Sequence, residues 1–253
     1  MVIYSFGGAP IRVQSTVDII RCGLMAKLIV TIDGPAGVGK STVSRMLACR
    51  IGAAFLDTGA MYRAVTLAAL KRGADLRDES KVHEVMDTCR FEFQIADDLM
   101  RVSVDGEDVT EAIREPSITA QVRHVASAGL LRNRLVEMQR QFASQHDRIV
   151  SEGRDQGTVV FPDADFKFYL TADVDERARR RAAQDAETGN PARLDDVRRS
   201  IEERDRSDTS RTVGPLRPAD GAIAIDTTDM NAEEVVTEML EQISGRPDGS
   251  QGR

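Results

Sequence analysis

A glycine-rich segment constrains this chain more than any other feature of its sequence. Residues 31–42 read TIDGPAGVGKST, in which Gly34 is followed after four residues by Gly39, Lys40 and Ser41. This spacing is typical of a loop whose backbone N–H groups point inward at a polyphosphate. The apolar run 28–32 before the loop predicts a buried strand, and residues 42–52 after it predict a helix. Strand, glycine loop and helix in this order predict an α/β fold that binds phosphate.

The loop predicts a role for each of its residues. Lys40 would reach the β- and γ-phosphates, the Ser41 hydroxyl would ligate Mg²⁺, and the N-terminus of the following helix would add partial positive charge. Two interpretations of Asp33 stay open: a carboxylate in the outer coordination shell of Mg²⁺, or a cap for the turn. The residues expected to enclose the phosphates are Gly34, Pro35, Ala36, Gly37, Val38, Gly39, Lys40, Ser41 and Thr42.

Composition excludes several classes of partner. The formal net charge is −7, aromatic residues make up 4 % and tryptophan is absent, so we expect neither a nucleic-acid nor an anionic-membrane surface as partner. No apolar run reaches the length of a transmembrane helix. The cysteines, Cys22, Cys49 and Cys89, show no metal-ligand or disulfide spacing, which predicts a protein of the reducing cytoplasm.

The order of the remaining segments predicts a parallel sheet covered by helices on both faces. Strand-like apolar runs occupy residues 28–32, 53–56, 148–151, 166–171 and 222–226. Amphipathic helical stretches occupy residues 41–51, 59–72, 130–145, 175–187, 194–204 and 232–244. Alternating strands and helices imply right-handed crossovers, and hence a three-layer α/β domain.

Three segments depart from this alternation. Residues 87–118 alternate apolar and polar side chains around Asp105 and Gly106, which predicts a small antiparallel insert. The turn cluster 187–193 lies within a charged helical region and predicts a mobile lid. Residues 1–24 do not have the pattern of a signal peptide. We interpret them as a disordered or non-native extension before Met25, and residues 245–253 as a polar tail.

A second group of polar residues follows the second and third predicted strands. Thr58, Tyr62 and Arg63 come after one strand, and the neighbours Arg154 and Asp155 come after the other. Because the carboxyl ends of parallel strands meet at one edge, we expect these residues beside the glycine loop. The alternatives are an ordinary helix cap for the first group and a structural Arg–Asp pair for the second.

Residues 173–217 hold eleven arginines against eleven acidic residues. One interpretation is a pair of solvated, salt-bridged helices. The other is a lid that brings arginines to a transferring phosphoryl group. The spacing of Arg204, Asp208 and Arg211 at i, i+4 and i+7 predicts that they share one helix face, with two arginines around one carboxylate.

Two motifs that the chain lacks narrow the class of enzyme it can belong to. The chain has no Asn-Lys-x-Asp tetrapeptide for guanine and no long apolar run ending in Asp-Glu, which disfavours GTPases and motor ATPases. A small-molecule kinase remains, with a second edge site for its acceptor. Its acceptor could be a nucleoside monophosphate or another small molecule such as shikimate. A non-catalytic nucleotide switch is the distant alternative.

The motifs TIDGPAGVGKST, LDTGAMYRA, DGEDVTEAIR, EGRDQGTVVFPDA, ERARRR and RDRSDTSR, in this order, resemble bacterial cytidylate kinases over about residues 27–242. The resemblance implies a P-loop nucleoside monophosphate kinase fold with a five-stranded parallel sheet. It implies a domain over residues 25–244, with a core (25–86 and 148–244), a monophosphate-binding insert (about 87–147) and a helical lid (about 178–212). It also implies direct in-line transfer of the ATP γ-phosphoryl group to CMP or dCMP with Mg²⁺.

The resemblance carries roles to matching residues. Lys40, Arg180 and Arg204 match groups near the transferring phosphoryl. The positions that match the CMP site are Thr58, Tyr62, Arg63, Arg132, Arg154, Asp155, Asp208 and Arg211. Two positions depart from the family: Arg123 stands where a serine usually contacts cytosine, and Gln156 stands where an apolar residue is common. We expect a monomer.

Overall fold

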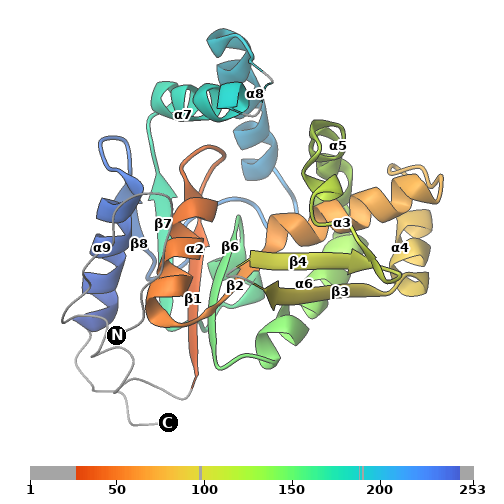
Figure 1. The fold of residues 1–253 in the computed structure, drawn as a ribbon, viewed down its shortest axis with the longest axis horizontal. Helices are drawn as coiled ribbons and strands as arrows, with labels where there is room; N and C mark the ends of the chain where they lie inside the picture. Colours follow the sequence, from red (N-terminus) through yellow and green to blue (C-terminus); the bar gives the residue numbers. More distant parts are fainter. Residues whose placement is uncertain (1–26, 97–98, 188, 190, 246–253) are drawn as a thin grey trace.

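The computed structural model describes residues 27–96, 99–187, 189 and 191–245. Its centre is a five-stranded parallel sheet (Figure 1). In spatial order the strands are β2 (Ala54–Asp57), β6 (Arg148–Gly153), β1 (Leu28–Asp33), β7 (Phe166–Thr171) and β8 (Ile223–Asp226). This confirms the predicted sheet, with strand ends that differ from the expected ones by a few residues at most.

Both faces of the sheet are buried, because alternate residues of a strand point to opposite sides. Phe55 and Val150 pack into one cluster with residues of α2 (Lys40–Ile51) and α9 (Ala232–Ser244). Their neighbours Leu56 and Ile149 pack into a second cluster with residues of α3 (Thr58–Lys71) and α6 (Gly129–Ser144). The result is the three-layer arrangement that the sequence predicts.

The predicted antiparallel insert is present as a three-stranded sheet of β3 (Phe91–Ala96), β4 (Leu99–Val104) and β5 (Glu107–Asp108). Asp105 and Gly106 join β4 to β5 with φ angles of 51° and 84°, as a tight hairpin turn requires. Met100 and Val102 of β4 lie in the same buried cluster as α3. The insert therefore packs beside the main sheet and lies near α3 (Figure 1).

Two helices were not predicted from the sequence. Helix α4 (Glu79–Thr88) begins where the Asp78 carboxylate accepts a hydrogen bond from the Lys81 N–H, and Val82, Val85 and Met86 bury its inner face. Helix α5 (Pro116–Ser127) begins with proline at its first position. The short elements η1 (Ala112–Arg114) and η2 (Gln156–Val160), the latter a single π-helical turn, were also not predicted.

Helices α7 (Val174–Glu187) and α8 (Leu194–Thr209) lie above the carboxyl ends of the strands (Figure 1). They hold each other through Ala178, Val197 and Ile201, which form a small buried cluster of their own. Helix α8 continues past the predicted end at residue 204. The expectations for residues 1–24 and for the tail after residue 245 lie outside the described residues. No helix in the described part of the chain is long and apolar enough to cross a membrane.

Candidate active site

The glycine loop (residues 34–39) joins β1 to α2 at the carboxyl edge of the sheet. Gly37 and Gly39 have φ angles of 82° and 87°, which L side chains rarely adopt. A side chain at Gly34 would overlap the backbone carbonyl of Leu170 in β7. Gly39 precedes the first turn of α2 and has no side chain to cap it. The N–H groups of this turn therefore face an anion-binding position.

Lys40 is only 6 % exposed and donates a hydrogen bond from Nζ to the Pro35 carbonyl at 2.7 Å. Burial, followed by the positive charge of Arg154, lowers the pKa of Lys40. Its ammonium group is thus held across the glycine loop in a desolvated place. A phosphate at the loop would supply the negative charge that this ammonium group lacks.

Sequence reasoning missed Glu152, which lies at the end of β6 beside the glycine loop. The Ser41 hydroxyl donates to Glu152 Oε1 at 2.6 Å, and the Thr58 hydroxyl donates to the Glu152 carbonyl at 2.7 Å. Burial, followed by the charge of Asp57, raises the pKa of Glu152. A cavity of about 40 Å³ lined by Ser41, Asp57 and residues of β4 adjoins this group. The signal in the sequence was its place at a strand end opposite the loop.

Asp33 lies at the end of β1 and is 3 % exposed. Its two carboxylate oxygens accept hydrogen bonds from the backbone N–H groups of Gln156 and Gly157 at 2.9 and 2.8 Å. Burial raises its pKa to about 6 although both bonds oppose the shift. Asp33 therefore caps a turn, but the turn is the one after β6 rather than the glycine loop.

The turn after β6 also explains how a glutamine fits at position 156, where the family commonly has an apolar residue. Its side chain is buried, accepts a hydrogen bond from the Ser151 hydroxyl at 2.7 Å and donates to Gln139 at 3.4 Å. A polar side chain is stable here because buried polar partners satisfy it. Nothing in its contacts points to a change in chemistry.

Arg132 and Asp155 form a buried ion pair on the insert side of the edge. Arg132 is 2 % exposed, also donates to the Ala126 carbonyl at 3.2 Å, and places its guanidinium 5.8 Å from the centre of the Tyr62 ring. Burial raises the pKa of Asp155 in spite of this partner, and burial raises that of Tyr62 to about 12. Three predicted residues from α3, α6 and the β6 turn thus meet in one place.

Arg154 and its neighbour Asp155 do not share one partner. Arg154 Nε donates to Asp208 Oδ2 at 2.7 Å, and Arg211 pairs with the other oxygen of Asp208. These arginines hold the pKa of Asp208 below its usual value against the effect of burial. Two arginines do contact the Asp208 carboxylate, but the second one beside Arg211 is Arg154 and not Arg204. The prediction of one helix face was wrong, because α8 ends at Thr209 before Arg211.

Arg63 extends this group on α3 and contacts Asp57 at 3.2 Å. In the described part of the chain, two buried guanidinium nitrogens have no hydrogen-bond partner: Arg63 Nε and Arg132 Nε. An unsatisfied buried donor costs about 1–3 kcal/mol. Both donors lie on residues that the sequence predicts to bind one anion.

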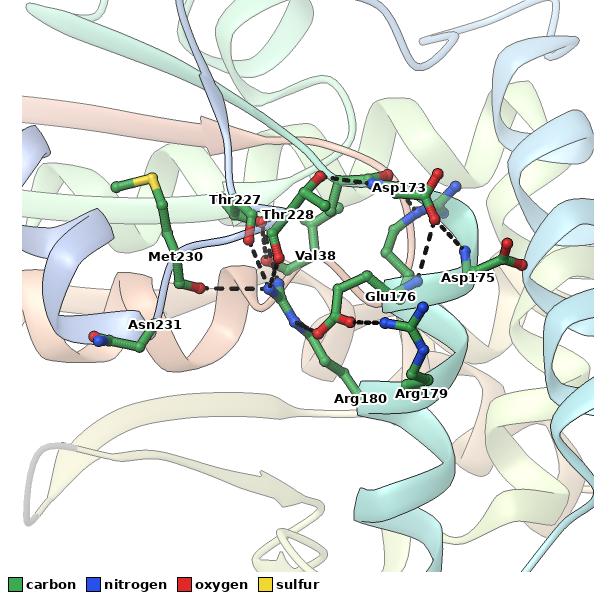
Figure 2. Close-up of polar contacts among 12 residues, drawn as sticks. Val38, Asp173, Asp175, Glu176, Arg179, Arg180, Thr227, Thr228, Met230 and Asn231 are labelled. Carbon is green, nitrogen blue, oxygen red and sulfur yellow. Dashed lines mark hydrogen bonds and ion pairs between the residues drawn. The ribbon is translucent and has the colours of Figure 1, made fainter.

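The structure separates the two arginines predicted from α7 and α8. Loss of solvent around the Arg204 guanidinium, followed by the positive charge of Arg154, lowers the pKa of Arg204 to about 10. Arg180 points toward the segment after β8 (Figure 2). It pairs with Glu176 at 3.0 Å and donates to the carbonyls of Thr227, Thr228 and Met230. In this arrangement Arg180 is held by carbonyl groups, and its expected place near the transferring phosphoryl stays a prediction.

Arg123 lies on α5 with an exposed side chain. The pair Arg132–Asp155 is instead covered by Gly214, whose φ angle is 59°. A side chain at Gly214 would overlap both members of the pair. Gly214 is a second residue that sequence reasoning missed.

Comparison with known proteins gives one consistent result. The family model described as cytidylate kinase matches residues 30–245. Cytidylate kinase of Rhodococcus jostii (strain RHA1) is 44 % identical over 228 residues, which cover 89 % of this chain and 99 % of the relative. The cytidylate kinase of Rhodococcus opacus (strain B4) is 45 % identical, covering 87 % and 96 %. That of Bacillus cytotoxicus is 40 % identical, covering 86 % and 96 %.

We expect Gly214→Ala to lower the free energy of unfolding by about 1–3 kcal/mol more than Gly221→Ala, because overpacking adds to the backbone strain. Gly221 is a matched control, since it also has a positive φ of 72° but nothing lies within 4 Å of an added Cβ. Urea unfolding of both variants measures the difference. Equal losses would contradict the close approach of Gly214 to the Arg132–Asp155 pair.

Proposed function

The chain belongs to the cytidylate kinase family, and from this premise we propose which of its residues bind each substrate. The enzyme transfers the γ-phosphoryl group of ATP to CMP or dCMP and releases ADP with CDP or dCDP. The observation that carries the assignment is the gathering of the glycine loop, Lys40 and two unsatisfied arginine donors at one sheet edge. Phosphoryl transfer depends mainly on such positioning and on charge neutralisation.

ATP would bind with its phosphates on the glycine loop and the first turn of α2. The N–H groups there donate to the phosphates, and Lys40 would exchange the Pro35 carbonyl for phosphate oxygens. Arg204 would stabilise the charge of the transferring group from the opposite side. Arg180 would take part only after its guanidinium leaves the carbonyls of residues 227–230.

The acceptor phosphate would bind between α3 and α6. Arg63 and Arg132 would donate to it through their free Nε–H groups, with Thr58 and Tyr62 lining the same place. The residues that would hold the pentose and cytosine are Arg154, Asp155, Asp208 and Arg211. Arg123 is exposed on α5 and is therefore compatible with this arrangement.

In the reaction, an oxygen of the CMP phosphate attacks the γ-phosphorus of ATP. The new P–O bond forms in line with the bond that breaks, and ADP keeps the electron pair of the bridging oxygen. The attacking oxygen is already anionic, so no general base is required. Residues 178–212, which include most of helices α7 and α8, would act as a lid over the substrates. The lid would exclude water, which otherwise would hydrolyse ATP. We also propose the division of residues 25–244 into a core (25–86 and 148–244), a monophosphate-binding insert (about 87–147) and this lid.

Mg²⁺ fits the oxygen groups beside the loop. The described residues contain no cluster of three or more side chains that could hold a metal by themselves. Mg²⁺ commonly binds through substrate phosphates and one or two protein oxygens. The Ser41 hydroxyl provides such an oxygen, and Glu152 is its hydrogen-bond partner behind it. When bound, the ion would neutralise charge on the β- and γ-phosphates. We further propose that the enzyme acts in the cytoplasm as a monomer, without nucleic-acid or membrane partners.

Arg211→Ala should raise the KM for CMP and lower kcat, because the change removes one of the two charges that hold Asp208. The loss of transition-state stabilisation should be about 2–4 kcal/mol, the scale of one buried charged contact. Steady-state kinetics with CMP as the varied substrate measure it. Arg217→Ala, an exposed arginine of the same segment, is the control. Unchanged kinetics in Arg211→Ala would overturn the assignment.

In Glu152→Gln, the gain in ATP affinity that Mg²⁺ provides should fall about tenfold. The hydrogen-bond partner of a metal ligand typically contributes that factor. Calorimetry of ATP with and without Mg²⁺ measures the effect independently of turnover. Glu241→Gln on the exposed side of α9 is the control. An unchanged gain from Mg²⁺ in Glu152→Gln would exclude this residue from the metal site.

A further inference from the structure

Ala36 of the glycine loop is hydrogen-bonded at both its N–H and its carbonyl by a pair of residues that no part of the mechanism above uses. The Ala36 N–H donates to Asp205 Oδ1 at 3.2 Å, and the Ala36 carbonyl accepts from Arg177 Nη1 at 3.0 Å. Arg177 lies on α7 and Asp205 on α8. The two side chains also form an ion pair with each other at 2.5 Å. A closed ring of bonds therefore links both helices to the loop.

Arg177 is the buried member of this pair. Arg177 is 8 % exposed and also donates from Nε to the Ala172 carbonyl at 3.0 Å, which fixes the direction of its guanidinium. The backbone of the loop touches it as well, since a Cβ at Gly37 would lie 3.1 Å from Arg177 Cβ. A planar guanidinium with this many partners has little freedom to move.

The bonds divide the loop into two halves. In the first half, Gly34 lies against the Leu170 carbonyl, the Pro35 carbonyl accepts from Lys40, and Ala36 is bonded at both ends. Protein groups thus occupy the polar backbone atoms around Ala36. The N–H groups of the second half and of the first turn of α2 are the ones directed to phosphate. A fixed first half sets the direction of these donors before ligand binds.

We propose that Arg177 and Asp205 act together as positioning residues that hold the backbone of Ala36, and through it the glycine loop, in the ATP-binding conformation. The same bonds tie that conformation to α7 and α8. Neither residue contacts the reacting atoms in this account. The proposal rests on ATP binding at the loop, as proposed above.

A merely structural pair would join α7 to α8 and do nothing else. The two helices, however, already pack through Ala178, Val197 and Ile201, which do not depend on the ion pair. Loss of the pair should therefore leave α7 and α8 together and change the loop. This separates a role in ATP binding from a role in folding.

The test uses Arg177→Gln, Asp205→Asn and the double variant in the full chain. The dissociation constant for ATP, measured by calorimetry without CMP, should rise about tenfold or more in each single variant, the scale of a charged hydrogen bond. The KM for CMP should stay within about twofold. The double variant should bind ATP no more weakly than the weaker single variant, because the two residues pair with each other and hold the same loop residue, Ala36.

Arg199→Gln is the matched control, since Arg199 forms an exposed ion pair with Asp196 at 3.6 Å on α8. Its ATP affinity should equal that of the wild type. An unchanged ATP affinity in the two single variants, with only a lower unfolding temperature, would overturn the proposal. Strictly additive losses in the double variant would also contradict it. If the wild type itself fails to bind ATP, the proposed function fails rather than the role of this pair.

Discussion

Positive charge buried at the carboxyl edge of the five-stranded sheet is the constraint on which the rest of this structure depends. Arg132, Arg154 and Arg177 each meet a carboxylate from a distant segment, namely Asp155, Asp208 and Asp205. Removing one partner of such a pair leaves an uncompensated charge and typically costs about 3–5 kcal/mol. The pairs therefore fix how the insert, the strand ends and the helices α7 and α8 meet, and with them the spacing between the two substrate sites.

The arrangement leaves an excess of unsatisfied positive charge. Burial, followed by the charge of Arg154, lowers the pKa of both Lys40 and Arg204, while two buried arginine nitrogens have no partner among the described residues. Phosphate groups of a donor and an acceptor would relieve both problems at once. The unsatisfied positive groups of the free protein thus lie where the two anionic substrates would bind. These groups need little rearrangement when charge develops during transfer.

The sequence predicted the parallel sheet and the glycine loop because both rest on local patterns, apolar runs and glycine spacing. Helix α4 was not predicted although Asp78 caps it and Val82 lies on its buried face. It is short, and the strand-like alternation of the insert follows it directly. The surroundings of Arg180 and Arg211 were not predicted, for a different reason. Their partners depend on where α8 ends and on the carbonyls after β8, which no periodicity encodes. Among eleven arginines in one segment, only tertiary contact distinguishes Arg177.

The most direct test of the central claim is coupled ADP release with ATP and Mg²⁺ against CMP, dCMP, UMP, AMP, GMP and shikimate. The account predicts fast turnover with CMP and dCMP, little with the purine nucleotides, and almost no ADP without an acceptor. Preference for UMP or shikimate would contradict the acceptor site, with Arg123 the first residue to replace by serine. Folded protein that releases no ADP in response to any acceptor would contradict the account as a whole.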